Sequence, residues 1–133
     1  MPVRSLSSAV LKWPSRESVV EAARRWAARL RADDPRVLAV GCIGSAARGV
    51  DWGAGSDLDL VVIVRDTPLS AAQRYQLYCP CGLPVPADLW TYTRSEWQRL
   101  ACEAPACFAR LRAEWLALAG QPQGPFSKKP PVG

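Results

Sequence analysis

The chain has 133 residues, of which 49% are hydrophobic and 22% charged, so its composition is that of a globular domain with a buried core. It contains no histidine, which excludes Ser-His-Asp triads, cysteine–histidine dyads, histidine-bearing zinc sites and histidine acid–base catalysis. If the protein is an enzyme, carboxylates, cysteines, lysines or a metal ion must carry the chemistry.

The net charge is +5, and arginine supplies 14 of the 17 basic residues. Because arginine makes bidentate contacts with phosphate, a phosphate-bearing ligand is one interpretation, and solvated helix faces are the other. The odd number of cysteines, and the absence of a signal-peptide pattern in residues 1–12, lead us to expect reduced thiols in the cytoplasm. No stretch approaches the about 20 apolar residues of a membrane helix, so we expect no membrane partner.

The first half of the chain predicts one helix and two strands. A helix is expected from Pro14-Ser15 to about Ala32, because apolar residues recur there every three or four positions. Val37–Ile43 is a short apolar run between helix breakers, and it predicts a buried strand. Leu58–Val64 is rich in β-branched residues and gives the strongest strand prediction of the chain.

The second half predicts further helices around a third strand, Ala87 to Tyr92. The expected helices are Ser70 to Tyr78, a segment capped by Thr93 or Ser95 that runs to about Glu103, and Ala106 to Ala119, ended by Gly120. Residues 121–133 hold four prolines and are interpreted as a flexible tail.

This order of elements predicts an α/β or α+β fold with a small mixed sheet of three to four strands and helices packed on it. We expect a single domain over residues 1–120, with its core at about residues 15–105.

Two carboxylates stand two residues apart where the second strand begins. The side chains of Asp57 and Asp59 should point to the same face, because side-chain direction alternates along a strand. Two adjacent carboxylates repel each other unless a cation joins them, and Mg²⁺ or Mn²⁺ is the natural partner of such oxygen ligands. Taken alone, an Asp-x-Asp pair can also cap a turn or face solvent.

A third carboxylate, Asp88, interrupts the apolar run of the third strand. A charge in a central strand needs a reason, although Asp88 could also begin the strand at a solvent-exposed end. If that strand lies beside the second one, Asp88 can join Asp57 and Asp59, and three carboxylates can hold two metal ions about 3.5–4 Å apart. Asp88 would then be a metal ligand or the general base near the nucleophile.

The step Gly44-Ser45 follows the first strand directly. A helix that begins there would offer free backbone N–H groups and a hydroxyl to a phosphate. Arg48 lies about one turn later, and it could reach a phosphate, hold the acidic loop or simply lie on the surface. The segment is neither a Walker loop nor a G-x-G-x-x-G motif.

With these residues in place, the sequence resembles the minimal nucleotidyltransferase group of the DNA polymerase beta-like superfamily. The pattern of that group is Gly-Ser, about ten residues, Asp-x-Asp and a third Asp on a later strand. Gly44-Ser45, Ser56-Asp57-Leu58-Asp59-Leu60 and Asp88 stand in those places, and the resemblance covers about residues 15–105.

The resemblance implies a polymerase beta-like fold and transfer of a nucleoside monophosphate, often AMP from ATP, to a hydroxyl with release of pyrophosphate. It implies catalytic, Mg²⁺- or Mn²⁺-binding roles for Asp57, Asp59 and Asp88, and nucleotide-binding roles for Gly44, Ser45, Arg48 and Ser56. Two features depart from the pattern: Ala46 stands where an aromatic residue is frequent, and the loop from Val50 to Gly55 is slightly long. In that loop, Trp52 could either stack on a base or pack against the core.

The acceptor of the nucleotide is open at this point. Minimal members are commonly paired with a helical HEPN-type protein in toxin–antitoxin systems, where they act as the antitoxin, so the resemblance implies such a partner. The segments around 97–100 and 108–118 could dock a partner or only cover the sheet. A non-catalytic binding or antitoxin module and a small-molecule nucleotidyltransferase of the aminoglycoside type are the alternatives. Binding of nucleic acid is possible, but the sequence does not indicate it. The oligomeric state is open. Cys79 and Cys81 are interpreted as buried or idle thiols of a loop, because C-x-C lacks a second pair for zinc.

Overall fold

A computed structural model describes residues 13–120, so the predicted tail at 121–133 lies outside the described residues. The elements in chain order are α2 (Arg16–Asp33), β1 (Val37–Ile43), α3 (Gly44–Arg48), β2 (Leu58–Val64), α4 (Ala71–Tyr78), β3 (Ala87–Thr93), α5 (Arg94–Glu103), α6 (Pro105–Glu114) and β4 (Leu116–Gly120). Within these residues, every helix is too short or too polar to span a lipid bilayer.

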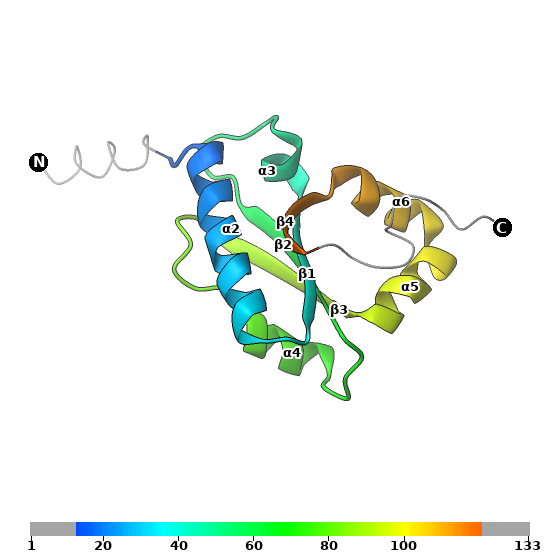
Figure 1. The fold of residues 1–133 in the computed structure, drawn as a ribbon. Helices are drawn as coiled ribbons and strands as arrows, with labels where there is room; N and C mark the ends of the chain where they lie inside the picture. Colours follow the sequence, from blue (N-terminus) through cyan, green and yellow to red (C-terminus); the bar gives the residue numbers. More distant parts are fainter. Residues whose placement is uncertain (1–12, 121–133) are drawn as a thin grey trace, which may run out of the picture.

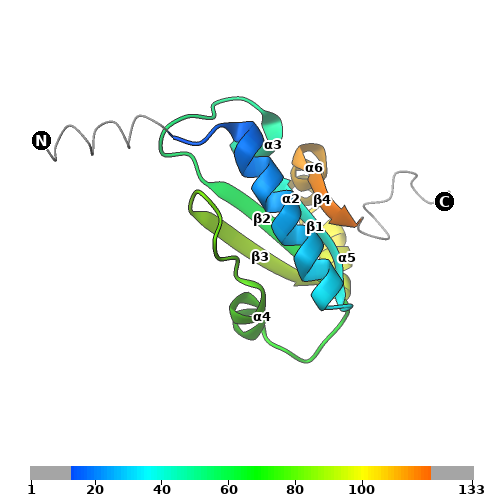
Figure 2. The same cartoon turned by 60° about the vertical axis from the view of Figure 1, so that its left-hand side comes forward.

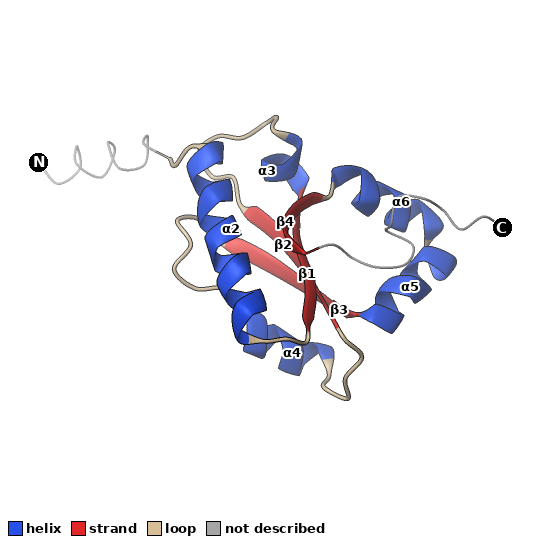
Figure 3. Ribbon diagram, in the orientation of Figure 1, coloured by secondary structure: helices blue, strands red, loops and turns tan. Residues whose placement is uncertain are grey.

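The four strands form one mixed sheet in the order β3-β2-β1-β4. β1 runs antiparallel to both β2 and β4, whereas β2 and β3 are parallel and are joined through α4 (Figure 3). The predicted mixed sheet of three to four strands with packed helices is confirmed, with four strands.

Helices cover both faces of this sheet, as Figures 1 and 2 show. On one face α2 packs through residues such as Val19, Ala23 and Trp26 against the side chains of β1 and β2. On the other face Trp97 of α5 and Phe108 of α6 pack against Val61 and Ile63 of β2. The helical parts of the segments around 97–100 and 108–118 therefore cover the sheet, as one of the two predicted roles has it, whereas residues 116–118 belong to the sheet itself.

Local sequence signals set most of the element boundaries. The side chain of Ser15 caps α2 by accepting the N–H of Ser18, and both Ser70 and Thr93 form capping boxes at the starts of α4 and α5. The predicted strands 37–43 and 58–64 are confirmed with the same bounds, and the third strand extends one residue beyond its prediction, to Thr93.

The predicted helix from Ala106 to Ala119 is wrong in its last third. α6 ends at Glu114, and Leu116–Gly120 forms the edge strand β4, so Gly120 closes a strand and not a helix. Leucine and alanine favour a helix locally, but the free edge of β1 offers a full set of backbone hydrogen bonds to this segment. The pairing of Cys42 with Leu116 therefore overrides local propensity.

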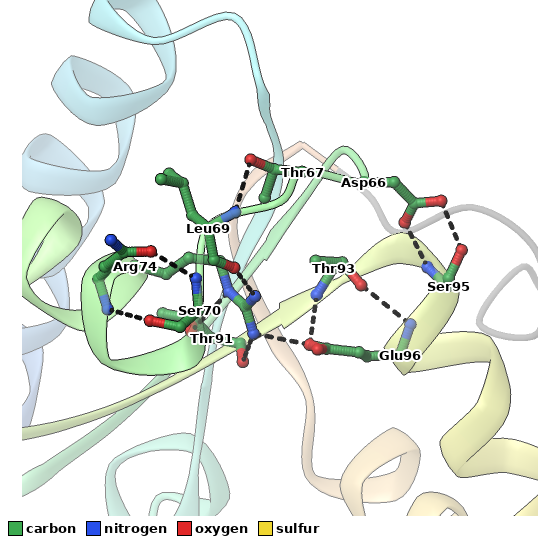
Figure 4. A network of polar contacts seen from close by, with 10 residues as sticks. Asp66, Thr67, Leu69, Ser70, Arg74, Thr91, Thr93, Ser95 and Glu96 are labelled. Carbon is green, nitrogen blue, oxygen red and sulfur yellow. Dashed lines mark hydrogen bonds and ion pairs between the residues drawn. The ribbon is translucent and has the colours of Figure 1, made fainter.

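A buried arginine joins α4, β3 and α5 (Figure 4). Arg74 is 2% exposed, and it donates to the backbone oxygen of Leu69, to Thr91 and to the Glu96 carboxylate, the last at 2.7 Å. Glu96 also accepts the N–H of Thr93 in the α5 capping box. The network thereby fixes β3 against the two helices that follow β2 and β3 in the chain.

Candidate active site

Two of the predicted carboxylates face each other across the parallel strands β2 and β3. Asp59 is the register partner of Asp88, near the start of both strands. Asp57 lies one residue before β2 and two before Asp59. Asp59 is half-buried, whereas Asp57 and Asp88 are exposed. Sequence reasoning required the third strand to lie beside the second for these groups to meet, and the register confirms that condition.

The ionisation of Asp59 reflects this crowding. Burial raises its pKa above the ordinary value of 3.8, and the nearby carboxylates of Asp88, Asp57 and Glu114 raise it further, while Arg48 lowers it. The negative charge of Asp59 is therefore costly, and a neighbouring cation would lower that cost.

One premise about Asp88 is wrong. β3 is an edge strand and not a central one, and Asp88 is exposed, so burial gives no separate reason for its charge. What singles it out is its place opposite Asp59. A hollow of about 300 Å³ between α4, β3 and α5 lies elsewhere, and none of the predicted site residues lines it.

Gly44, the residue that follows β1, lies against the carboxylate of Asp59. Its φ is +79°, a conformation that favours glycine, and a Cβ at this position would collide with Oδ2 of Asp59. The close approach explains why the residue after β1 is a glycine, and it puts the backbone of Gly44 against the half-buried carboxylate.

The short helix α3 is fixed from two sides. Ala46 is fully buried in the core on the α2 side of the sheet, and Arg16 at the start of α2 donates to the carbonyl oxygens of Ala46 and Ala47. A small residue at 46 fits this packing, whereas an aromatic one would not. Ser45 follows Gly44 in the first turn of α3.

A residue that sequence reasoning missed, Glu114, also lies at this site. Its Oε1 accepts the N–H of Gly44 at 3.1 Å, and its Oε2 pairs with the Arg48 guanidinium at 3.4 Å. Arg48 is exposed and contacts α6, so the structure shows no contact with the acidic loop and agrees with the prediction that Arg48 lies on the surface. No local signal announces Glu114, because it reaches the site only through the pairing of β4 with β1.

The loop between α3 and β2 is ordered by its own contacts. The hydroxyl of Ser56 accepts the N–H of Gly53 at 3.0 Å, so Ser56 stabilises the turn just before Asp57. The Trp52 indole N–H donates to the backbone oxygen of Pro14 at 3.0 Å, and its ring packs on the core. This arrangement corresponds to the second of the two roles predicted for Trp52.

The donor set suits a hard divalent cation, because it consists of carboxylate oxygens. In residues 13–120, no group of three or more cysteine, aspartate or glutamate side chains is already arranged so that it could hold a metal ion. The side chains of Asp57 and Asp88 are exposed, so each has room to change rotamer toward Asp59.

No family model matches the chain, and no curated protein matches its sequence. Solved structures do match its fold. A proposed nucleotidyltransferase from Sulfolobus solfataricus superposes with a TM-score of 0.53 at 20% identity, over 63% of this chain and 75% of that one. A toxin–antitoxin structure with AMP-PNP superposes with a TM-score of 0.52 at 21% identity, over 73% of each chain. At this identity the likeness concerns the fold alone.

Proposed function

We propose that the protein is a metal-dependent nucleotidyltransferase that transfers a nucleoside monophosphate, AMP from ATP being our expectation, to a hydroxyl group. The observation that carries the proposal is the pairing of Asp59 with Asp88, beside Gly44, in a chain with the nucleotidyltransferase fold. Asp57, two residues before Asp59, completes the acidic group.

In this proposal Asp57, Asp59 and Asp88 hold Mg²⁺ or Mn²⁺. A bound cation would supply positive charge that offsets the repulsion among the carboxylates and the negative charge of a triphosphate. Burial, and then repulsion from the neighbouring carboxylates, raises the pKa of Asp59, and a cation would relieve both effects, which supports this assignment.

The remaining groups bind phosphate and move a proton. The backbone N–H of Gly44, the Ser45 hydroxyl and Arg48 bind the triphosphate, and Ser56 is proposed to contribute at the loop. The acceptor's hydroxyl oxygen forms a bond to the α-phosphorus, and the bond from that phosphorus to the bridging oxygen breaks. Pyrophosphate leaves with the bonding electrons, and the hydroxyl proton passes to the Asp88 carboxylate and then to water.

The test is ATP binding by calorimetry, with and without Mg²⁺. The wild-type protein should bind ATP more tightly with Mg²⁺, and Asp59→Asn should abolish that dependence. Asp33→Asn is the matched control, because Asp33 is an exposed residue at the far end of α2 and its substitution changes the net charge equally. An ATP affinity that changes neither with Mg²⁺ nor with Asp59→Asn would refute the proposal.

We further propose a protein as acceptor or partner, with the chain acting as the antitoxin of a pair with a HEPN-type protein. The likeness to a toxin–antitoxin structure with AMP-PNP supports this setting. The test is intact mass spectrometry of a small helical protein encoded next to this one. The two proteins are co-expressed and then incubated with Mg²⁺ and each nucleoside triphosphate. A nucleotide adduct on the partner that disappears with the Asp57→Ala/Asp59→Ala variant supports catalysis. If the partner binds both the wild type and the variant but carries no adduct with either, the non-catalytic alternative is supported.

A further inference from the structure

Glu114 is an acidic residue with both carboxylate oxygens engaged by groups that the proposed function assigns to phosphate. It is the last residue of α6, and its side chain is 24% exposed. One oxygen accepts the N–H of Gly44 at 3.1 Å and the other pairs with Arg48 at 3.4 Å. The carboxylate thus binds one backbone donor and one guanidinium, as a phosphate oxygen pair would.

The chain on either side holds Glu114 in this position. The next residue, Trp115, packs over Gly41 so closely that a Cβ there would collide with its ring. Leu116 then pairs with Cys42 as β4 begins. Glu114 is therefore brought to the end of β1, where α3 starts, by the two anchored residues that follow it.

The position is electrostatically unusual for a carboxylate. Glu114 is one of the negative groups whose field reaches Asp59, and Asp57 and Asp88 contribute to the same field. A fourth negative charge there adds to the repulsion at Asp59.

We propose that Glu114 is a self-inhibitory carboxylate, which occupies Gly44 N–H and Arg48 in the nucleotide-free protein and must be displaced when a polyphosphate binds. The inference rests on the proposed function for its ligand class. Displacement opens the contacts of Glu114 with Gly44 and Arg48, while β4 stays paired with β1.

The test is calorimetric binding of inorganic tripolyphosphate, which has no base or ribose. Glu114→Gln keeps the shape of the side chain and an acceptor for Gly44, but it loses the charge. We expect it to bind tripolyphosphate about five- to tenfold more tightly than the wild type, the value of a partly exposed charged contact. Glu103→Gln, at the exposed last residue of α5, makes the same change of net charge and should leave binding unchanged.

Equal or weaker binding by Glu114→Gln would overturn the inference, as would an absence of binding by every protein. Should the variant fold poorly, the wild type gives the answer by NMR. Titration with tripolyphosphate should shift the Gly44 amide and the Glu114 side-chain carboxyl resonance together, and an unmoved carboxyl resonance overturns the inference.

These outcomes are separable from those of the proposed function. If Mg²⁺-dependent ATP binding persists while Glu114→Gln binds tripolyphosphate like the wild type, only the inference fails. If Glu114→Gln tightens tripolyphosphate binding, but the ATP affinity depends neither on Mg²⁺ nor on Asp59→Asn, only the proposed function fails.

Discussion

Asp59 links stability to pH at the scale of a single residue. Its folded-state pKa lies above the ordinary value of 3.8, chiefly through burial and then through Asp88 and Asp57. Below pH 3.8 the group is protonated in both folded and unfolded chains, so it contributes no difference. As pH rises above that value the unfolded chain loses this proton first, so the charged group costs the folded state stability.

We therefore expect Asp59→Asn to raise the melting temperature at pH 7 in Mg²⁺-free buffer, with the gain vanishing as pH falls toward 3.8. Mg²⁺ should raise the melting temperature of the wild type and leave that of Asp59→Asn unchanged. Melting curves from pH 3 to 8 measure both effects. If the melting temperatures of the two proteins depend on pH in the same way, the charge of Asp59 does not destabilise the folded state.

A second prediction concerns Gly44, where a side chain would meet both an unfavourable backbone conformation and a steric collision. Gly44→Ala should lower the free energy of unfolding by about 1–2 kcal/mol for its left-handed backbone, and by more for the collision with Asp59. Gly55→Ala is the matched control, since Gly55 has a φ of +88° but open space around it. Urea denaturation of both variants isolates the collision, and equal losses would contradict it.

Secondary-structure elements were predictable where local signals and periodicity agree. The strands 37–43 and 58–64 have apolar, β-branched sequences between breakers, and Ser15 marks the start of α2 as capping chemistry requires. β4 was not predictable, because Leu116–Ala119 suits a helix and only the open edge of β1 makes it a strand. The same pairing delivers Glu114, so the missed strand and the missed site residue have one physical cause.

At the scale of elements, the Arg74 network should decide how firmly α4 and α5 hold β3. Arg74→Met removes a guanidinium that is 2% exposed and leaves acceptors at Leu69 and Thr91 unsatisfied, so we expect a loss of about 2 kcal/mol. The estimate is modest because the Glu96 side chain keeps 38% exposure and remains hydrated.

Arg25→Met is the control for Arg74→Met. Its ion pair with Glu21 has both side chains about 60% exposed and should be worth less than about 0.5 kcal/mol. Denaturant midpoints of the two variants make the comparison. Equal effects would show that the network does not anchor the strand.

The whole molecule is organised around β1, which pairs with a strand on each side and is covered by helices on both faces. Sequence patterns predicted the strand itself and the α2 face, but not its central place, since β4 comes from the far end of the described chain. Cys42 marks this centre: it is fully buried, and burial raises the pKa of its thiol to about 12. The other four cysteines, at 79, 81, 102 and 107, are free and exposed.

This contrast makes Cys42 a probe of unfolding for the entire described chain. Iodoacetamide at pH 8 should modify the four exposed cysteines of the native protein, while Cys42 stays unmodified because it is both inaccessible and protonated. Its side chain packs in the core that α2 covers, so fraying of β4 alone does not expose it. Labelling of Cys42 along a urea gradient, read by peptide mass spectrometry, should therefore follow the circular dichroism transition. Labelling well before that transition would mean that α2 separates from the sheet while the rest stays folded, and the two faces of β1 would then be independent units of stability.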